Sequence, residues 1–251
     1  MKIAVLVVSC DKYSDIWNLF FKTFNEYWPD CPYKIYLGTN HLKCNNANVE
    51  TINIGDDVSY SDNLIKMMDQ IESDYIIMWV DDLMLTSSVK TNQLREIVDY
   101  SIQQNLDFVK LLPNFPYSYI EEKHGIGRLP NGIKYQVTIG ISIIKKSFMK
   151  TVTSTGKTAW ELEYDIARNI INDTSFKIYA LSSRIKSYPI SFINLLGRGK
   201  VIRNSVAYAI NNGEKKLVDK RGLQPVKDYI YYRSYLLLLW AFKKLNMHWK
   251  T

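Results

Sequence analysis

The chain has 251 residues, 47% of them apolar, and a formal net charge of +7. This composition indicates a globular protein with one domain, or one domain and a small appendage, and excludes a disordered chain. The positive charge favours anionic partners, which include nucleic acid, acidic lipid headgroups and phosphorylated substrates. The three cysteines lack CxxC spacing and accompany only three histidines. That pattern indicates neither a zinc site nor a disulfide framework, and it favours a reducing cytosol.

The first ninety residues alternate between strand and helix patterns. Strands are predicted at residues 2–10, 33–39 and 49–54, and helices at 13–28 and 61–71. The first helix has an aromatic stripe at three- and four-residue spacing, formed by Trp17, Phe20, Phe21, Phe24 and Trp28. A further apolar strand within residues 74–85 runs into Asp81 and Asp82. This alternation predicts an α/β fold with a mostly parallel central sheet and helices on both faces.

The second half of the chain is more varied. A helix is predicted at residues 91–105, with Thr91 as its cap, and a strand at 108–112. Residues 113–132 read as a long surface loop that shapes a pocket. Residues 135–144 alternate like a strand, in which Gly140 suggests close approach of a ligand or another backbone. After a helix that begins at Thr158, we expect a strand at 176–181 and a break at 211–216.

Asp81 and Asp82 are the first candidates for chemistry. Two adjacent carboxylates at the polar end of a buried strand repel one another, and a hydrated Mg²⁺ or Mn²⁺ ion would compensate their charge. Such an ion would take phosphate oxygens as its remaining ligands. The alternative is that both residues only end a strand and cap a turn. The pair alone does not decide between these interpretations.

Polar residues follow the first two predicted strands at the same sheet edge. Asp11 can accept hydrogen bonds from a base or ribose, and Tyr13 can stack on a base. The alternative is that Ser9 or Asp11 caps the following helix, and Asn40 has the same ambiguity. The chain contains neither a GxGxxG motif nor a Walker P-loop. Phosphate recognition would therefore depend on a metal and on basic side chains.

Two later segments can complete such a site. The turn at residues 197–200 is basic and rich in glycine, so Arg198 or Lys200 can close over a diphosphate, although a solvated turn explains it equally well. Thr158 and Glu161 have the spacing of a capping box, which explains Glu161 without catalysis. The capping box leaves Trp160 and Glu163 less well explained, and a carboxylate near the start of a helix, beside an indole that excludes water, is placed to take a proton from an incoming hydroxyl. Spacing does not choose between Glu161 and Glu163, but a helix directs them to different faces.

In this order, these motifs resemble a known family. A first strand ending in Ser-x-Asp-x-Tyr, a helix ending near Trp-Pro-Asp, an extended run ending in Thr-Asn, a strand ending in Asp-Asp and a later Trp-Glu-x-Glu helix are similar to small bacterial glycosyltransferases of the GT-A fold. The resemblance covers roughly residues 1–200. Enzymes of this kind are common in the biosynthesis of surface polysaccharides such as capsule and O-antigen. The aspartates here are adjacent, which departs from the DXD pattern of that family.

The resemblance implies a specific assignment of roles. Asp82 would bind a divalent metal, Mn²⁺ or Mg²⁺, that bridges the nucleotide diphosphate, and Asp81 would lie by the ribose or the metal. Asp11 would lie at the nucleoside, and Glu161 or Glu163 would be the base of an inverting transfer to a surface-glycan precursor. Residues 1–212 would form the GT-A-like (Rossmann-like) catalytic domain, whose nucleotide-sugar-binding half is 1–114 and whose acceptor half is 115–212.

Residues 213–251 form the expected C-terminal helical appendage, which is basic and aromatic. Its apolar run is too short to span a bilayer. Tyrosines and Trp240 beside Arg233, Lys243 and Lys244 suit a helix lying on an anionic membrane through residues 226–250, although a core or dimer helix explains the leucines equally well. A polyprenyl-diphosphate-linked glycan acceptor at the inner face of the cell membrane would suit a cytoplasmic enzyme of this kind. The alternative function is a non-catalytic protein that binds nucleic acid or membrane, but the scattered lysines argue against nucleic acid.

Overall fold

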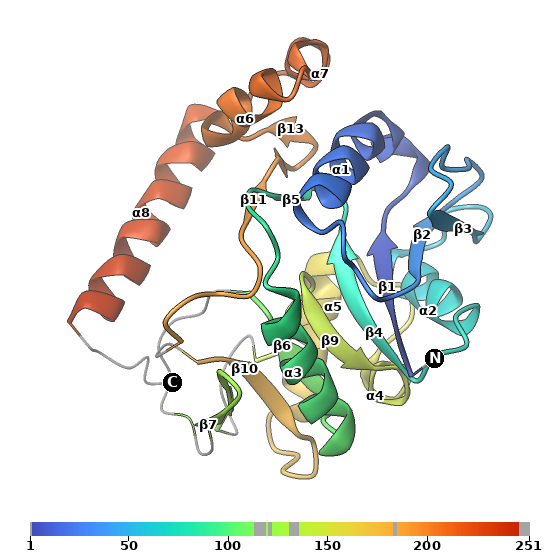
Figure 1. Ribbon diagram of the computed structural model, residues 1–251, viewed down its shortest axis with the longest axis vertical. Helices are drawn as coiled ribbons and strands as arrows, with labels where there is room; N and C mark the ends of the chain where they lie inside the picture. The colour runs from blue at the N-terminus through green and yellow to red at the C-terminus, as the bar shows by residue number, and fades with distance from the viewer. Residues whose placement is uncertain (1, 113–118, 120–121, 131–135, 183–184, 246–251) are drawn as a thin grey trace.

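The structure is a computed structural model, and it describes residues 2–112, 119, 122–130, 136–182 and 185–245. A nine-stranded sheet forms its centre, in the order β3-β2-β1-β4-β9-β6-β10-β8-β7 (Figure 1). Its strands are β1 Ile3–Val8, β2 Ile35–Thr39, β3 Val49–Asn53, β4 Tyr75–Val80, β6 Phe108–Lys110, β7 Glu122–Lys123, β8 Ile126–Arg128, β9 Ser142–Lys145 and β10 Ile178–Leu181. Two smaller strand pairs join β5 Leu83–Leu85 to β11 Phe192–Asn194, and β12 Leu196–Gly197 to β13 Lys200–Val201.

Most strands of the central sheet run in one direction, as the sequence predicted. β1 pairs in parallel with β2 and β4, and β2 pairs in parallel with β3. β9 is antiparallel to both β4 and β6, so β6 and its parallel partner β10 run the same way as β1. The ends of β1, β2 and β4 therefore meet at one edge of the sheet, where ligands commonly bind in open α/β folds.

Helices cover both faces of this sheet. They are α1 Ser14–Tyr27, α2 Tyr60–Asp69, α3 Thr91–Gln103, α4 Lys146–Val152, α5 Ala159–Ile170, α6 Val206–Asn211, α7 Lys215–Arg221 and α8 Val226–Lys244, with short 3₁₀ turns at Asp11–Tyr13 and Arg203–Ser205. Alternate residues of β1 belong to two core clusters, Val5 and Val7 to the cluster with α1 and α3, and Leu6 to the cluster with α2, α4 and α5. A strand buried on both faces reads as a continuous apolar run, which explains the sequence of β1.

The aromatic stripe of α1 packs against β4, the strand that ends in the two aspartates. Phe20, Phe24 and Trp28 each lie within 6.4 Å of Trp79, measured between ring centroids. All four rings are buried. Edge-on and tilted contacts of this kind stabilise a core beyond the area that they bury. The end of β4 is thus held by a rigid aromatic cluster.

Several local predictions were wrong. Thr91 does not cap α3, because its hydroxyl accepts from Trp28 and donates to Asp30. In the described part of the strand predicted at 135–144, only residues from Ser142 onward form a strand, β9, and the nearest neighbour of Gly140 is the Leu112 side chain. The described part of the predicted loop at 113–132 contains β7 and β8, which extend the sheet edge. The β7–β8 hairpin was missed because it is stabilised by the pairing of β8 with β10, a distant strand that local sequence patterns do not reveal.

The C-terminal segment has two parts. Leu217 of α7 is buried in the same core cluster as α1, so α7 packs on the main body. α8 runs along one side of the molecule, away from the central sheet (Figure 1), and most of its described side chains are exposed. Among the described residues, no helix combines the length and apolar character needed to cross a membrane. The division between residues 212 and 213 stays a prediction.

Candidate active site

Asp81 and Asp82 form the turn between β4 and β5. β4 is fixed by its pairing with β1, which places Val80 opposite Val8. β5 turns away because it pairs with β11, and the Asp82 carbonyl accepts from the Leu195 N–H at 2.8 Å. Two distant parts of the chain, β1 and residues 192–195, therefore fix the backbone of the two aspartates.

Asp81 is buried and held from the side of β1. Its carboxylate accepts a hydrogen bond from the Ser9 hydroxyl, which in turn accepts from Trp17 Nε1 at 2.7 Å. Burial raises the pKa of the Asp81 carboxyl well above its usual range, and Asp82 raises it further, against the bond from Ser9. Neither Ser9 nor Asp11 caps the following helix, so that interpretation was wrong.

A cavity of about 590 Å³ opens beside both aspartates. Its wall is made by the ends of β1 and β4, the start of α2, the start of α5 and the β12–β13 turn. The residues that line it are Val8, Ser9, Cys10, Tyr13, Asp57, Val58, Ser59, Tyr60, Asn63, Met67, Val80, Asp81, Asp82, Thr158, Ala159, Trp160, Leu196, Gly197 and Arg198. We call this space the large cavity. Its volume lies in the range of cofactor and nucleotide sites.

A second cavity of about 200 Å³, the small cavity, adjoins the first. Tyr60, Val80, Asp82, Ala159 and Trp160 line both spaces. Glu163 lines only the small cavity, together with Leu83 and Ile139. Asp82 thus lies at the boundary between the two spaces, and burial raises the pKa of its carboxyl to about 6.

The two glutamates of α5 have different surroundings. Glu161 accepts from the N–H and hydroxyl of Thr158 at 2.9 and 2.8 Å, which confirms the predicted capping box, and its side chain lies outside both cavities. Glu163 accepts from the Ile139 N–H. Burial raises the pKa of Glu163, while the Ile139 N–H and the charge of Lys110 oppose the rise. Of the two glutamates of α5, only Glu163 lines the small cavity.

Asp11 and Asn40 fasten the ends of neighbouring strands. The Asp11 carboxylate accepts from the N–H groups of Asn40, His41 and Leu42 at 3.1–3.2 Å, and the Asp11 N–H donates to Asn40 Oδ1 at 3.1 Å. Asn40 Nδ2 donates to the Gly55 carbonyl. Neither residue lines the large cavity. Their bonds hold the edge of the sheet on which the site is built.

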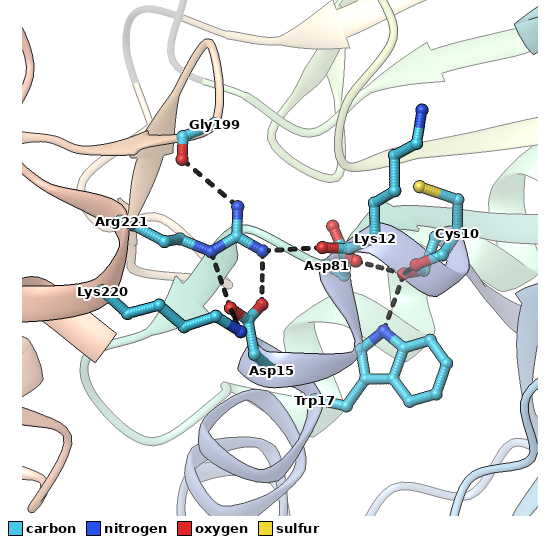
Figure 2. A network of polar contacts seen from close by, with 9 residues as sticks. Cys10, Lys12, Asp15, Trp17, Asp81, Gly199, Lys220 and Arg221 are labelled. Carbon is cyan, nitrogen blue, oxygen red and sulfur yellow. Dashed lines mark hydrogen bonds and ion pairs between the residues drawn. The ribbon is translucent and has the colours of Figure 1, made fainter. Parts of the chain in front are cut away.

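The predicted basic turn is the tip of the β12–β13 hairpin. Arg198 and Gly199 both have positive φ angles, 51° and 77°, and Arg198 lines the large cavity. The Lys200 side chain is exposed and lies outside the cavity lining. On the same side of the cavity, the Tyr13 ring is covered by the guanidinium of Arg221, 4.8 Å from its centroid. Figure 2 shows Arg221 between Asp15 and the carbonyl of Gly199.

Three residues near the site were missed in the sequence. Tyr60 lines both cavities, and its buried hydroxyl has no hydrogen-bond partner among the described residues. Burial lowers the pKa of Lys110 to about 8, against the charge of Glu163. Arg221 comes from α7, beyond the predicted domain boundary. None of these residues has a local motif, since each is brought to the site only by tertiary packing.

The two aspartates offer the oxygen ligands that a hard divalent cation prefers. Within the described ranges, no group of three or more His, Cys, Asp or Glu side chains is placed to hold a metal alone. Mg²⁺ is commonly bound by one or two carboxylates, with phosphates and water as its other ligands. Asp81 and Asp82 both line the large cavity, and neither forms an ion pair with a cation among the described residues. They can therefore share such an ion with a diphosphate.

The sequence matches no protein-family model and no curated protein. Among solved structures, S. aureus TarS is similar at 13% identity over 72% of this chain and 35% of that chain, with a TM-score of 0.47. S. aureus TarS 1-349 in complex with UDP is similar at 11% identity over 72% of this chain and 58% of that chain, with a TM-score of 0.49. A cytidylyltransferase from Leptospira borgpetersenii is similar at 14% identity over 77% of this chain and 82% of that chain, with a TM-score of 0.48. The chain spans less than two thirds of the TarS chains, and likenesses this distant carry no inference about function.

Proposed function

We propose that the chain is a glycosyltransferase that moves a sugar from a nucleotide-diphosphate donor to a glycan acceptor, as the family resemblance of its motifs implies. The observation that supports this proposal is the separation of carboxylates between two adjoining cavities. Asp81 and Asp82 line the large cavity, and Glu163 lines only the small one. Sugar transfer needs one group of charges at the leaving diphosphate and a separate base at the incoming hydroxyl.

The donor would occupy the large cavity. Asp82, with Asp81 beside it, would hold Mg²⁺ or Mn²⁺, which stabilises the negative charge that develops on the leaving diphosphate. Arg198 also lines this cavity and supplies a positive charge, and Lys200 follows it in the same hairpin. The Tyr13 ring also lines this space, where a base or ribose can contact it. Asp11 and Asn40 would act indirectly, by fixing the strand ends.

The acceptor hydroxyl would enter the small cavity. Glu163 takes its proton while the hydroxyl oxygen bonds to the anomeric carbon, and the bond from that carbon to the diphosphate breaks with its electron pair going to phosphate. Attack from the face opposite the leaving group inverts the anomeric centre. The Ile139 N–H holds the Glu163 carboxylate in place, and Trp160 lines both cavities. Glu161, which is occupied in the capping box, would have no role in the reaction.

Metal-dependent binding of a nucleoside diphosphate is the direct test. At a ligand concentration 100 times Kd, binding stabilises the fold by about 2.7 kcal/mol. For a chain of this size that corresponds to a rise of roughly 5–10 °C in the unfolding temperature. We expect one member of a panel of UDP, CDP, GDP and TDP to give this rise with Mn²⁺ or Mg²⁺ present. The rise should be lost in EDTA.

Two controls separate this proposal from other functions. A variant with Asp82→Asn should lose the metal-dependent rise while it still unfolds cooperatively. A stabilisation by a single-stranded oligonucleotide, with none by any nucleoside diphosphate, would instead indicate a nucleic-acid-binding protein. Release of free sugar from nucleotide sugars, screened with metal present, then identifies the donor.

We also propose that the acceptor is a surface-glycan precursor held at the inner face of the cell membrane, and that α8 lies on anionic lipid there. Among its described side chains, Ile230, Tyr231, Leu237 and Trp240 are more than half exposed. Lys244 lies over the Trp240 ring at 4.9 Å. Apolar and aromatic side chains beside cations are typical of helices that lie in the headgroup region.

Vesicle flotation tests this contact. The protein is expected to float with vesicles that contain 30% phosphatidylglycerol, and to float less with pure phosphatidylcholine. Replacing both Leu237 and Trp240 by glutamate should abolish flotation, because it removes apolar surface and adds negative charge. Equal flotation of this variant would contradict the proposal. A concentration-dependent dimer that the same substitutions dissociate would show that α8 binds a second copy instead.

A further inference from the structure

Arg221 joins three separate segments next to the large cavity. Its Nε and Nη2 atoms donate to the two carboxylate oxygens of Asp15 in α1. Nη2 also donates to the Lys12 carbonyl at 2.9 Å, and Nη1 donates to the Gly199 carbonyl at 3.2 Å. The Arg221 side chain is 11% exposed and the Asp15 side chain 20% exposed. A planar guanidinium is suited to such a junction because its donors are fixed in one fork.

The segments that Arg221 joins carry walls of the large cavity. Tyr13 lines the cavity and lies under the guanidinium. Gly199 follows Arg198, which lines the cavity from the β12–β13 turn. Positive φ angles at both loop residues are usual in two-residue hairpins, but Arg198 is less suited to this conformation than glycine, so outside contacts add to the stability of the turn. Each strand of the hairpin has only two residues, and the bond from Arg221 to Gly199 is one of those contacts.

Arg221 itself does not line the large cavity, so it acts on a ligand through its neighbours. Its contacts are stable at neutral pH. Partial burial raises the pKa of the Asp15 carboxyl, but the bonds from Arg221 and Lys220 outweigh this, and the net pKa is lowered. A lowered carboxyl pKa means that the pair contributes stability above the ordinary value of 3.8 and loses it only as the pH falls further.

We propose that Arg221 is a positioning residue that fixes Tyr13 and the Arg198 turn as one wall of the large cavity, in the arrangement that binds a nucleoside diphosphate. This inference rests on the proposed function for the identity of the ligand. It makes the chain beyond residue 213 a part of the donor site. Arg198 meets the ligand, and Arg221 determines where Arg198 is.

Lys220 provides a matched control on the same helix. Its Nζ donates to the same Asp15 oxygen as Arg221 Nε, at 3.0 Å. Among the described contacts, those to Gly199, Lys12 and the Tyr13 ring are made by Arg221 and not by Lys220. Lys220 is 69% exposed. The variant Lys220→Gln therefore removes one positive charge from Asp15 and leaves the cavity wall intact. Arg221→Lys keeps a charge at Asp15 but removes the fork that reaches Gly199.

The first measurement needs no ligand. Trypsin cleaves after Arg198 and Lys200, and mass spectrometry can follow those two bonds separately from the rest of the chain. We expect cleavage there to be at least about fivefold faster in Arg221→Gln and in Arg221→Lys, because local opening governs proteolysis. Lys220→Gln should be cleaved at the rate of the unaltered protein. Equal rates in all four proteins would show that Arg221 does not hold the turn, and would overturn the proposal.

The second measurement is the Kd of the nucleoside diphosphate that stabilises the unaltered protein most, with Mn²⁺ present. Arg221→Gln and Arg221→Lys should each raise this Kd about tenfold or more, because the Arg198 guanidinium is no longer held where it can bind the diphosphate. At saturating donor, turnover should fall less than about threefold, because the reacting groups are untouched. If Arg221→Gln unfolds, Arg221→Lys alone decides the matter. If the Arg221 variants bind the nucleoside diphosphate with the same Kd as Lys220→Gln, the proposal is overturned.

The two measurements also separate the failure of this inference from the failure of the proposed function. If no nucleoside diphosphate binds the unaltered protein, the proposed function is wrong, and so is the assignment of the wall to a diphosphate. Binding by the unaltered protein together with unchanged cleavage and unchanged Kd in the Arg221 variants rejects only the role of Arg221.

Discussion

Sugar transfer by a variant with Asp82→Asn is expected to be slower than by the unaltered protein by at least about a thousandfold, since metal stabilisation of a leaving group is worth several kcal/mol. Asparagine keeps the shape of the side chain but removes the charge that a cation needs. Asp82 lines both cavities and so lies where donor and acceptor would meet. Turnover of the identified nucleotide sugar, measured over a range of Mn²⁺ concentrations, tests this expectation.

The same variant should not lose stability. Burial raises the pKa of the Asp82 carboxyl to about 6 from an ordinary value of 3.8, so the charged form is disfavoured in the folded state. The cost in folding free energy of ionising Asp82 is absent below pH 3.8, grows as the pH rises toward about 6 and is constant at higher pH. Urea unfolding in EDTA at pH 7.5 should therefore show Asp82→Asn to be as stable as the unaltered protein or more so. Full activity in a folded variant would contradict the role of Asp82.

Replacing Glu163 by glutamine is expected to reduce kcat by about 10² to 10⁴-fold, the usual contribution of a general base. Donor binding should survive, because Glu163 lies outside the lining of the large cavity. Glu161→Gln is the matched control, two residues away on α5. It weakens the capping box and is expected to cost at most about 2 kcal/mol of stability with little change in kcat. Equal loss of kcat in both variants would contradict the assignment.

The pH dependence of kcat gives a second test of Glu163. The base must be ionised, so kcat should fall as the pH drops through the pKa of Glu163, which burial raises above the ordinary value of 4.5. The charge of Lys110 opposes that rise. Lys110→Met should therefore raise the pKa of Glu163 further and move the acidic limb of the profile to higher pH. An unmoved limb in a folded, active Lys110→Met variant would show that another group titrates.

Sequence patterns predicted the parts of this protein that depend on local periodicity. The alternation of helices and strands over the first ninety residues and the capping box at Glu161 both follow from spacing and composition. The choice of Glu163 could not be made from sequence, because it depends on the Ile139 N–H and on the position of the small cavity. The pairing of β5 with β11 was missed for a similar reason.

For the polar residues at the strand ends, too, the sequence predicted the location but not the tertiary contacts. Sequence placed Ser9, Asp11 and Asn40 at the correct edge of the sheet, but it could not say which of them faces a cavity. Ser9 lines the large cavity and binds Asp81, whereas Asp11 and Asn40 bind each other and the loop beyond β2. Which of these residues faces the cavity depends on contacts between β1, β2 and β4, and these contacts cannot be predicted from the sequence of one segment.

The contact between Asp15 and Arg221 spans 206 positions of the chain. During translation, the β1–α1 and β4 segments leave the ribosome long before α7 has been made. A nascent chain can therefore pack its aromatic core early, while the wall around Arg198 forms only after α7 has been made. Contacts of such high sequence separation form slowly, so recovery of ligand binding after dilution from urea should lag behind recovery of the tryptophan fluorescence of that core.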